Sequence, residues 1–197
     1  MKARMFAPVL LCVVVGASLF AAAAEQVKPG QPAPDLRLPQ ADGTMVSVAE
    51  SKGKVVLVDF WASWCGPCKA SFPALDEIYR DLHDRGLEVI AVNLDERRDD
   101  ANGFLADKPH SMTVVFDPEG TAATAYGLTG LPTSFLVGRD GRVRFVHTGY
   151  TSKTLDGYRR EIEQLLGETT GSSASTKHTA PSTQHQAHST KHIAPST

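Results

Sequence analysis

The sequence predicts an α/β domain with a mixed central sheet flanked by helices and an N-terminal β-hairpin extension. Lys54–Ala62 is a nearly continuous apolar run, which is typical of a strand covered on both faces. A helical pattern follows from about Pro67 to Arg85, and Leu87–Leu94 is a second apolar run. Two buried strands joined by one helix form a parallel crossover unit. The later Asp140-Gly141 pair predicts an antiparallel hairpin, so the sheet is expected to be mixed.

The first expected element is a hairpin that precedes the buried strands. Residues Asp35–Val48 alternate on both sides of Asp42-Gly43, and Asp-Gly between alternating runs is a strong hairpin signal. The helix after the first buried strand is supported by apolar residues at helical spacing, and Gly86 stands where a helix commonly ends. These apolar residues are Phe72, Leu75, Ile78, Tyr79 and Leu82.

Shorter elements follow and lead to a closing helix. Thr154–Leu166 carries Leu155, Tyr158 and Ile162 on one helical face, which indicates an amphipathic helix packed on the sheet. The other expected elements are a short helix or loop at Asp99–Asp107, a strand at Thr113–Phe116, a short helix at Thr121–Tyr126, and strands at Ser134–Arg139 and Arg142–Val146.

Residues 1–24 are typical of a secretory signal peptide. Lys2 and Arg4 precede the apolar run MFAPVLLCVVVGASLF, and alanines follow up to an Ala-x-Ala cleavage site near Ala24. An uncleaved membrane anchor is the alternative, because residues 5–24 are just long enough to span a bilayer. The protein is therefore expected to be periplasmic or otherwise exported, and membrane-anchored if cleavage does not occur.

Residues 168–197 are predicted to be a disordered tail rich in Ser, Thr and His. The segment lacks periodic apolar residues and repeats STKHTAPST as STKHIAPST, so it cannot bury enough surface to offset its ordering entropy. Four of the seven histidines lie here, which leaves metal binding by the tail as an alternative to a solvated spacer. Residues 25–167 remain as one domain. With a net charge of −2 and no basic patch, the chain is not expected to bind nucleic acid.

Cys65 and Cys68 carry the chemistry that the sequence suggests. Zinc needs four ligands, and there is no second cysteine pair and no histidine at ligand spacing, so no metal is expected at these two residues. A purely structural disulfide is disfavoured because closing so short a loop removes little entropy from the unfolded chain. Disulfides persist in exported proteins. A redox-active disulfide, with no other cofactor, is therefore the favoured interpretation.

The two cysteines are expected to have different roles. Cys65 ends the turn between strand and helix, where free backbone N–H groups and the helix dipole favour a thiolate. It is predicted to be the exposed nucleophile. Cys68, one turn into the helix, is placed to resolve the mixed disulfide. Gly66-Pro67 makes the turn tight and presets the helical φ.

The motifs around this pair resemble those of the thioredoxin superfamily, and more closely the exported TlpA-like thiol-disulfide oxidoreductases. The resemblance is carried by DFWASWCGPCK at Asp59–Lys69, by Pro73, and by GLPTSFLV at Gly130–Val137. The segments VNLDE, FDPEGTAATAYGLTG and DGRV follow the order seen in that branch. The resemblance covers about Pro32 to Leu166 and implies a thioredoxin-like fold.

The resemblance also implies roles for residues outside the cysteine motif. Pro132 would be a cis proline facing the cysteines, flanked by Leu131 and Thr133, where a partner chain is held in an extended pose. Asp59 would be the buried carboxyl beneath Cys68. Burial raises the pKa of such a carboxyl, so Asp59 could accept the Cys68 proton. Because many exported relatives carry Asn at the Asp59 position, a purely structural role stays open.

Two tryptophans frame the motif. Trp64, Gly66 and Pro67 are expected to contribute to the docking surface, whereas Trp61, in an apolar strand, is expected to pack in the core. Lys69 either adds positive field near the thiols or is simply solvated. Glu96 resembles an acidic position near the site of some of these reductases.

The expected function is reduction of disulfides in client proteins outside the cytoplasm, with cytochrome c maturation as one setting. Partners would be those clients and a membrane thiol reductase that supplies electrons, and the protein is expected to be a monomer. The alternatives are a thioredoxin-fold binding or chaperone module without turnover, and a peroxiredoxin-like peroxide reductase.

Overall fold

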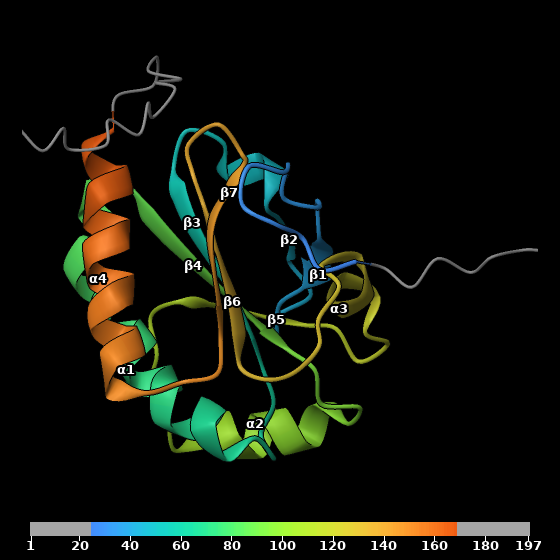
Figure 1. Ribbon diagram of the computed structural model, residues 1–197. Helices are drawn as coiled ribbons and strands as arrows, with labels where there is room; N and C mark the ends of the chain where they lie inside the picture. Colours follow the sequence, from blue (N-terminus) through green and yellow to red (C-terminus); the bar gives the residue numbers. More distant parts are fainter. Residues whose placement is uncertain (1–24, 169–197) are drawn as a thin grey trace, which may run out of the picture.

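The computed structural model describes residues 25–168, which form a central five-stranded sheet (Figure 1). The strand order is β5-β4-β3-β6-β7. β3 pairs in parallel with β4, which pairs in parallel with β5, whereas β6 runs antiparallel to both β3 and β7. The predicted mixed sheet is confirmed. The strands are β3 (Val55–Trp61), β4 (Leu87–Asn93), β5 (Thr113–Phe116), β6 (Thr133–Val137) and β7 (Val143–Thr148).

Helices cover both faces of this sheet. Figure 1 shows α1 and α4 side by side on one face, with the N-terminal hairpin and α3 on the other. The hairpin consists of β1 (Arg37–Pro39) and β2 (Met45–Ser47), which pair antiparallel as a separate two-stranded sheet. The helices are α1 (Gly66–Leu82), α2 (Arg98–Ala106), α3 (Thr121–Ala125) and α4 (Ser152–Gly167).

The side-chain alternation of β3 divides the core into two parts. Leu57 and Trp61 join the apolar cluster beneath α1 and α4, whereas Val58 and Phe60 join the cluster beneath the hairpin and α3. Successive side chains in a strand point to opposite faces, so Asp59 lies on the same face as Leu57 and Trp61. The carboxyl group is thus placed on the face that α1 covers.

Both predicted hairpins form, the first with shorter strands than expected and the second with shifted strand ends. The N-terminal hairpin has strands of three residues joined through residues 40–44, where Gly43 adopts a φ of 87°. In the second hairpin β7 begins at Val143, and the register shifts between Leu136 and Val137. Gly141 there has a φ of 78°, the left-handed region that glycine tolerates best.

The α-helical part of α1 ends earlier than predicted. Residues His83–Arg85 form a 3₁₀ turn, and Gly86 with a φ of 97° terminates it, as its position in the sequence suggests. Pro73 lies inside α1 and is exposed. The short helix predicted as one alternative at Asp99–Asp107 is present as α2.

The two ends of the chain lie outside the described residues, as do the predictions of a signal peptide or anchor and of a disordered or metal-binding tail. Between residues 25 and 168, no helix combines the length and the apolar character needed to cross a bilayer.

Candidate active site

The cysteines meet at the junction between β3 and α1. Their sulfur atoms are bonded at 2.04 Å, with the Cα atoms 5.2 Å apart. Cys65 is the N-cap residue of α1 and has an extended backbone, whereas Cys68 lies in the first helical turn. The pair is therefore joined across the first turn of α1, with Cys65 before the helix and Cys68 inside it.

The start of α1 directs one backbone N–H at the Cys65 sulfur and another at the Cys65 carbonyl. The backbone N–H of Cys68 donates to Cys65 Sγ at 3.2 Å, and the N–H of Lys69 donates to the Cys65 carbonyl at 3.1 Å. Gly66 and Pro67 occupy the first two helical positions. A hydrogen bond to sulfur and a helix N-terminus both favour a thiolate over a thiol.

Cys65 is less accessible than the sequence suggests. Its exposed fraction is only 6% in this disulfide form, and that of Cys68 is 0%. The bond turns the Cys65 sulfur toward its buried partner, and both cysteines join the apolar cluster that contains Trp61 and Phe72. Cys65 is slightly more exposed than Cys68, and the division of roles between the two stays a prediction. Trp64, beside it, is 70% exposed.

The Leu131–Pro132 peptide bond is cis, as the resemblance implies. Pro132 is buried and Leu131 is half-buried against the cluster that contains both cysteines. Within residues 25–168, the backbone N–H and C=O of Leu131 make no hydrogen bond, so both remain able to pair with an extended chain.

The Thr133 side chain is not placed for docking. It is fully buried, and its Oγ1 donates to the Gly130 carbonyl at 2.8 Å. Thr133 is also the first residue of β6, where it is paired with β3 on one side and β7 on the other. Its contribution is therefore to hold the turn that carries the cis bond.

Asp59 is a buried carboxyl on the face of the sheet that carries the cysteine pair. Burial raises its pKa from an ordinary value of 3.8 to about 7, while a hydrogen bond from Ser134 opposes that rise. Ser134 Oγ lies 2.5 Å from Asp59 Oδ1, and the two residues are opposite each other in the β3–β6 pairing. A carboxyl with a pKa near neutrality can both accept and donate a proton.

Comparisons with known proteins agree with this arrangement. Residues 28–166 match the Redoxin family. The chain belongs to the Redoxin family. It is 33% identical over 148 residues to the thiol-disulfide oxidoreductase ResA of Bacillus subtilis strain 168, covering 75% of this chain and 82% of the relative. It is 30% identical over 163 residues to ResA of Bacillus thuringiensis subsp. konkukian, covering 81% and 94%.

Solved structures give the same assignment. A Chlorobium tepidum protein provisionally assigned as thiol:disulfide interchange protein DsbE superposes with a TM-score of 0.70 at 42% identity, covering 72% of this chain and all of that protein. A thioredoxin-family thiol:disulfide interchange protein from Chlorobium tepidum TLS gives a TM-score of 0.61 at 29% identity, with 72% and 99% covered. This redoxin is thus a TlpA-like member of the thioredoxin superfamily and a protein thiol-disulfide oxidoreductase.

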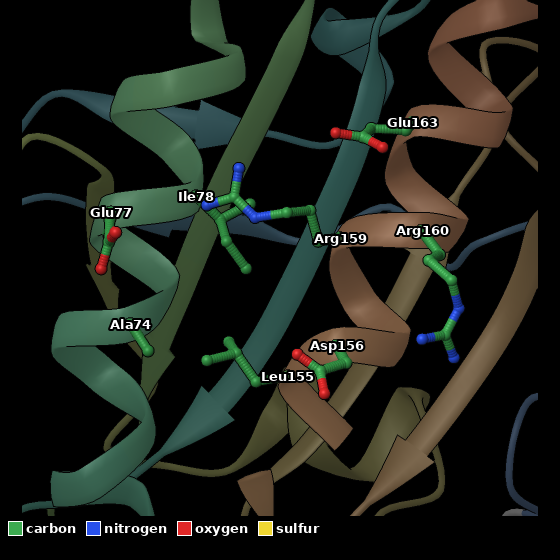
Figure 2. A pocket seen from close by; sticks show the side chains of 8 residues that line it. All are labelled: Ala74, Glu77, Ile78, Leu155, Asp156, Arg159, Arg160 and Glu163. Carbon is green, nitrogen blue, oxygen red and sulfur yellow. The ribbon is translucent and has the colours of Figure 1, made fainter. Parts of the chain in front are cut away.

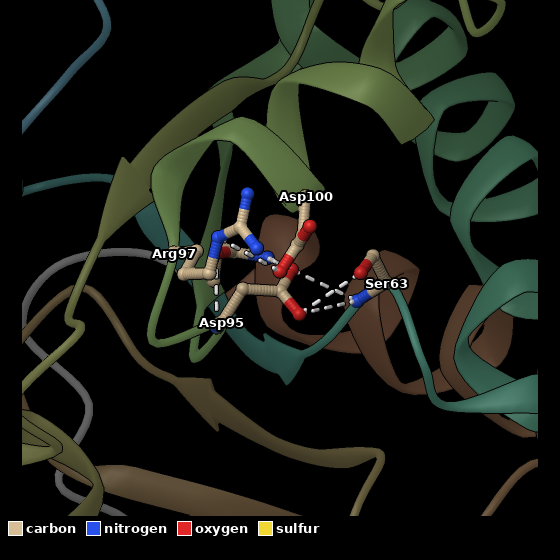
Figure 3. A network of polar contacts seen from close by, with 5 residues as sticks. Ser63, Asp95, Arg97 and Asp100 are labelled. Atoms are coloured by element: carbon tan, nitrogen blue, oxygen red, sulfur yellow. Dashed lines mark hydrogen bonds and ion pairs between the residues drawn. The ribbon is translucent and has the colours of Figure 1, made fainter.

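In this redoxin a buried carboxylate that the sequence analysis missed anchors the turn before Cys65. Asp95 accepts hydrogen bonds from the Ser63 backbone N–H at 3.0 Å and from Ser63 Oγ at 2.9 Å (Figure 3). It also accepts one from Asn93 Nδ2 at 2.7 Å. Glu96, the acidic residue expected near the site, is exposed. Polar residues at the carboxyl ends of two parallel strands share one edge of the sheet, and that signal could have identified Asp95.

The two tryptophans differ in burial, and the core position predicted for Trp61 is confirmed. Trp61 is fully buried, with its ring 4.9 Å from that of Phe72 and 5.2 Å from that of Phe104. Its indole nitrogen has no hydrogen-bond partner within the described chain. Trp64 presents its ring to solvent beside Cys65. Lys69 is exposed, as a solvated lysine would be.

A groove of about 450 Å³ lies between α1 and α4, away from the cysteine turn (Figure 2). Arg159 reaches across it toward α1 and pairs with Asp81 at 2.8 Å. Neither cysteine lines this groove. Across residues 25–168, no group of three or more His, Cys, Asp or Glu side chains is arranged to hold a metal ion.

Proposed function

We propose that this redoxin reduces disulfide bonds of client proteins outside the cytoplasm, through the Cys65/Cys68 couple. The observation that carries the proposal is the bonded cysteine pair at the start of α1, with exposed Trp64 next to it in sequence and Leu131 packed against the same apolar cluster as the two cysteines. Trp64, Gly66 and Pro67 are exposed beside the pair and can contact a protein chain, whereas a small molecule usually occupies a concave pocket.

The first step opens the client disulfide. The Cys65 thiolate attacks one client sulfur, a mixed disulfide forms, and the other client sulfur leaves as a thiolate. Extended client backbone next to the bond would pair with the free N–H and C=O of Leu131, as in other β-strand additions. Trp64 offers a flat, exposed apolar surface for client side chains.

The second step releases the client. Asp59 accepts the proton of Cys68, and the Cys68 thiolate then attacks the Cys65 sulfur of the mixed disulfide. The Cys65–Cys68 bond forms and the second client sulfur leaves as a thiolate. The client has gained two electrons and the cysteine pair has lost two, so an external dithiol must restore the reduced form. We propose a membrane thiol reductase for that role.

The surroundings of the pair support a reductant over an oxidant. A strong oxidant needs a strongly stabilised thiolate. Here the two residues between the cysteines are Gly66 and Pro67, which add no charged side chain, and Cys68 is fully buried. Ionised Asp59 on the same face would further disfavour thiolates and so favour the disulfide.

Covalent trapping tests the proposal and identifies the clients. A Cys68→Ser variant, made in a Cys12→Ser background to remove the third cysteine, should retain clients as mixed disulfides on Cys65 that mass spectrometry can identify. The matched Cys65→Ser/Cys68→Ser variant should retain none and should not reduce insulin. Unchanged client binding by this double variant, with no insulin reduction by the protein with both cysteines, would favour the binding module instead.

The direction and setting need separate measurements. A reduction potential below about −150 mV, measured against glutathione, supports the reductant, and a higher value places the protein among the oxidants. The resemblance to TlpA-like proteins motivates cytochrome c maturation as the setting. A disulfide-bonded CxxCH peptide should then be reduced faster than insulin.

Rapid hydrogen peroxide consumption in stopped-flow experiments would point to the peroxidase alternative.

A further inference from the structure

Asp59 begins a chain of buried hydrogen bonds that ends at Tyr158. Ser134 Oγ lies 2.5 Å from Asp59 Oδ1 and 2.8 Å from the Tyr158 hydroxyl. The three residues come from β3, β6 and α4, and all three are buried. Each of these polar groups therefore depends on the next one for its hydrogen bond. In the low dielectric of a protein core, consecutive hydrogen bonds strengthen one another.

We propose that Ser134 and Tyr158 are positioning residues that set the protonation equilibrium of Asp59, and through it the rate at which Cys68 closes the disulfide. The inference rests on the proposed function, in which Asp59 accepts the Cys68 proton. Neither hydroxyl takes that proton itself. Both act on the carboxyl that does.

The hydroxyl of Ser134 favours the ionised form of Asp59. When Asp59 is a carboxylate, Ser134 donates its proton to Oδ1, and Tyr158 donates to the Ser134 oxygen. Hydrogen bonds to a carboxylate lower its pKa, whereas burial raises it. In Asp59 the two effects oppose each other and leave the pKa at about 7. The serine thus holds the carboxyl in the range where it can exchange protons.

Tyr158 remains a donor because it does not ionise at physiological pH. Its pKa is raised first by burial and then by the charge of Asp59, with smaller contributions from Glu161 and Tyr150, while Ser134 lowers it. On β7, the His147 ring packs 4.6 Å from the Tyr158 ring, and His147 Nε2 lies 2.6 Å from Glu161 Oε2. The titratable groups near these three hydrogen-bonded residues are therefore Glu161 on α4, His147 on β7 and Tyr150 before α4. Cys68 on α1 belongs to the same apolar cluster as Tyr158.

Stopped-flow reaction with 5,5′-dithiobis(2-nitrobenzoate) isolates the step. In a Cys12→Ser background, attack by Cys65 releases one coloured thiolate, and closure by Cys68 releases a second. The rate of the second phase should rise with pH through an apparent pKa near that of Asp59. Ser134→Ala should shift this profile to higher pH by about one unit, because the carboxylate loses a donor. Tyr158→Phe should shift it in the same direction by about half as much, since it removes the second bond of the chain.

Two matched variants show whether a buried hydroxyl matters only for stability. Ser47 is also a buried serine whose Oγ donates to a carboxylate, Asp35, at 2.7 Å. Tyr126 is also a buried tyrosine, and its hydroxyl donates to the Pro34 carbonyl at 2.9 Å on the opposite face of the sheet. Ser47→Ala and Tyr126→Phe should lower stability and leave the pH profile in place. Ser134→Thr, which retains the hydroxyl, should restore the original profile.

An Asp59→Asn background separates this inference from the proposed function. In that background Ser134→Ala and Tyr158→Phe should no longer shift the pH profile of the second phase. In protein that retains Asp59, carboxyl ¹³C NMR of the reduced form should show that the same two changes move the Asp59 titration to higher pH by the same amounts. If Asp59→Asn changes the second phase but neither hydroxyl variant moves the profile or the titration, the inference is wrong and the proposed role of Asp59 stands. If Asp59→Asn leaves the second phase unchanged, the proposed role of Asp59 fails and the inference with it. Should Ser134→Ala not fold, Tyr158→Phe against Tyr126→Phe decides.

Discussion

Asp59 should make the fold less stable as the pH rises through neutrality. Its pKa in the folded protein is about 7, against 3.8 ordinarily, so the folded state holds this proton more tightly than the unfolded chain does. The associated stabilisation is complete below pH 4 and is lost as the pH rises toward 7. The free energy of unfolding of Asp59→Asn minus that of wild type should therefore be about 2–4 kcal/mol larger at pH 8 than at pH 4. Urea denaturation at both values measures this. The exposed Asp99→Asn change should give the same small difference at each pH, and an equal result for Asp59→Asn would contradict the burial of an ionisable group.

At the same scale, Asp95 should stabilise the turn that carries Trp64 and Cys65. Asp95→Ala leaves the Ser63 and Asn93 donors without an acceptor, which costs about 2–3 kcal/mol, and the loosened turn should slow insulin reduction several-fold. Ser63→Ala, which loses only one of these bonds, should cost about 1 kcal/mol. Glu96→Ala is the matched change at an exposed neighbour and should have little effect on either readout. Slower turnover from Glu96→Ala with normal turnover from Asp95→Ala would reverse the assignment.

The residues with a local sequence signal could be predicted, and those defined by long-range contacts could not. The cysteine pair, the cis bond before Pro132 and the burial of Asp59 all follow from motifs or from an apolar context. Ser134 is 75 residues from Asp59 in sequence, and Asp95 is 32 from Ser63. A short motif carries no information about which distant side chain completes a hydrogen bond. The low exposure of Cys65 has the same origin, since it depends on the disulfide and on what packs around it.

At the scale of elements, α4 should depend on its N-terminal cap. Thr151 Oγ1 accepts from the Thr154 N–H and Thr154 Oγ1 accepts from the Thr151 N–H, both at 3.2 Å, which forms a capping box. Thr151→Ala should lower the free energy of unfolding by about 1 kcal/mol without changing the denaturant dependence. Lys153→Ala, at an exposed position in the same helical turn, should have a much smaller effect. Equal destabilisation by the two changes would mean that the cap contributes nothing.

The elements with strong periodicity were predictable, and their ends and partners were less so. β3 and β4 stand out as apolar runs because both faces of a central strand are covered. The β1 and β2 strands are shorter than the alternation suggests, because the connection takes residues 40–44. The place of β6 between β3 and β7 is set by packing across the whole sheet. The sequence of β6 alone does not encode which strands lie beside it.

At the scale of the whole molecule, the redox state and the stability of the fold are linked by a closed cycle of reduction and unfolding. If folding favours the disulfide over the dithiol, the folded protein is a stronger reductant than its unfolded chain, and the oxidised form must be the more stable one. Burial of Cys68 in an apolar cluster disfavours a thiolate and so predicts this order.

In a Cys12→Ser background, guanidinium unfolding followed by tryptophan fluorescence should show the oxidised form about 2–4 kcal/mol more stable than the reduced form, where each 30 mV of potential corresponds to about 1.4 kcal/mol. Dithiothreitol should leave the Cys65→Ser/Cys68→Ser variant unaffected. A more stable reduced form would mean that folding drives the pair to take electrons from clients, and the direction of the reaction would then be that of an oxidant.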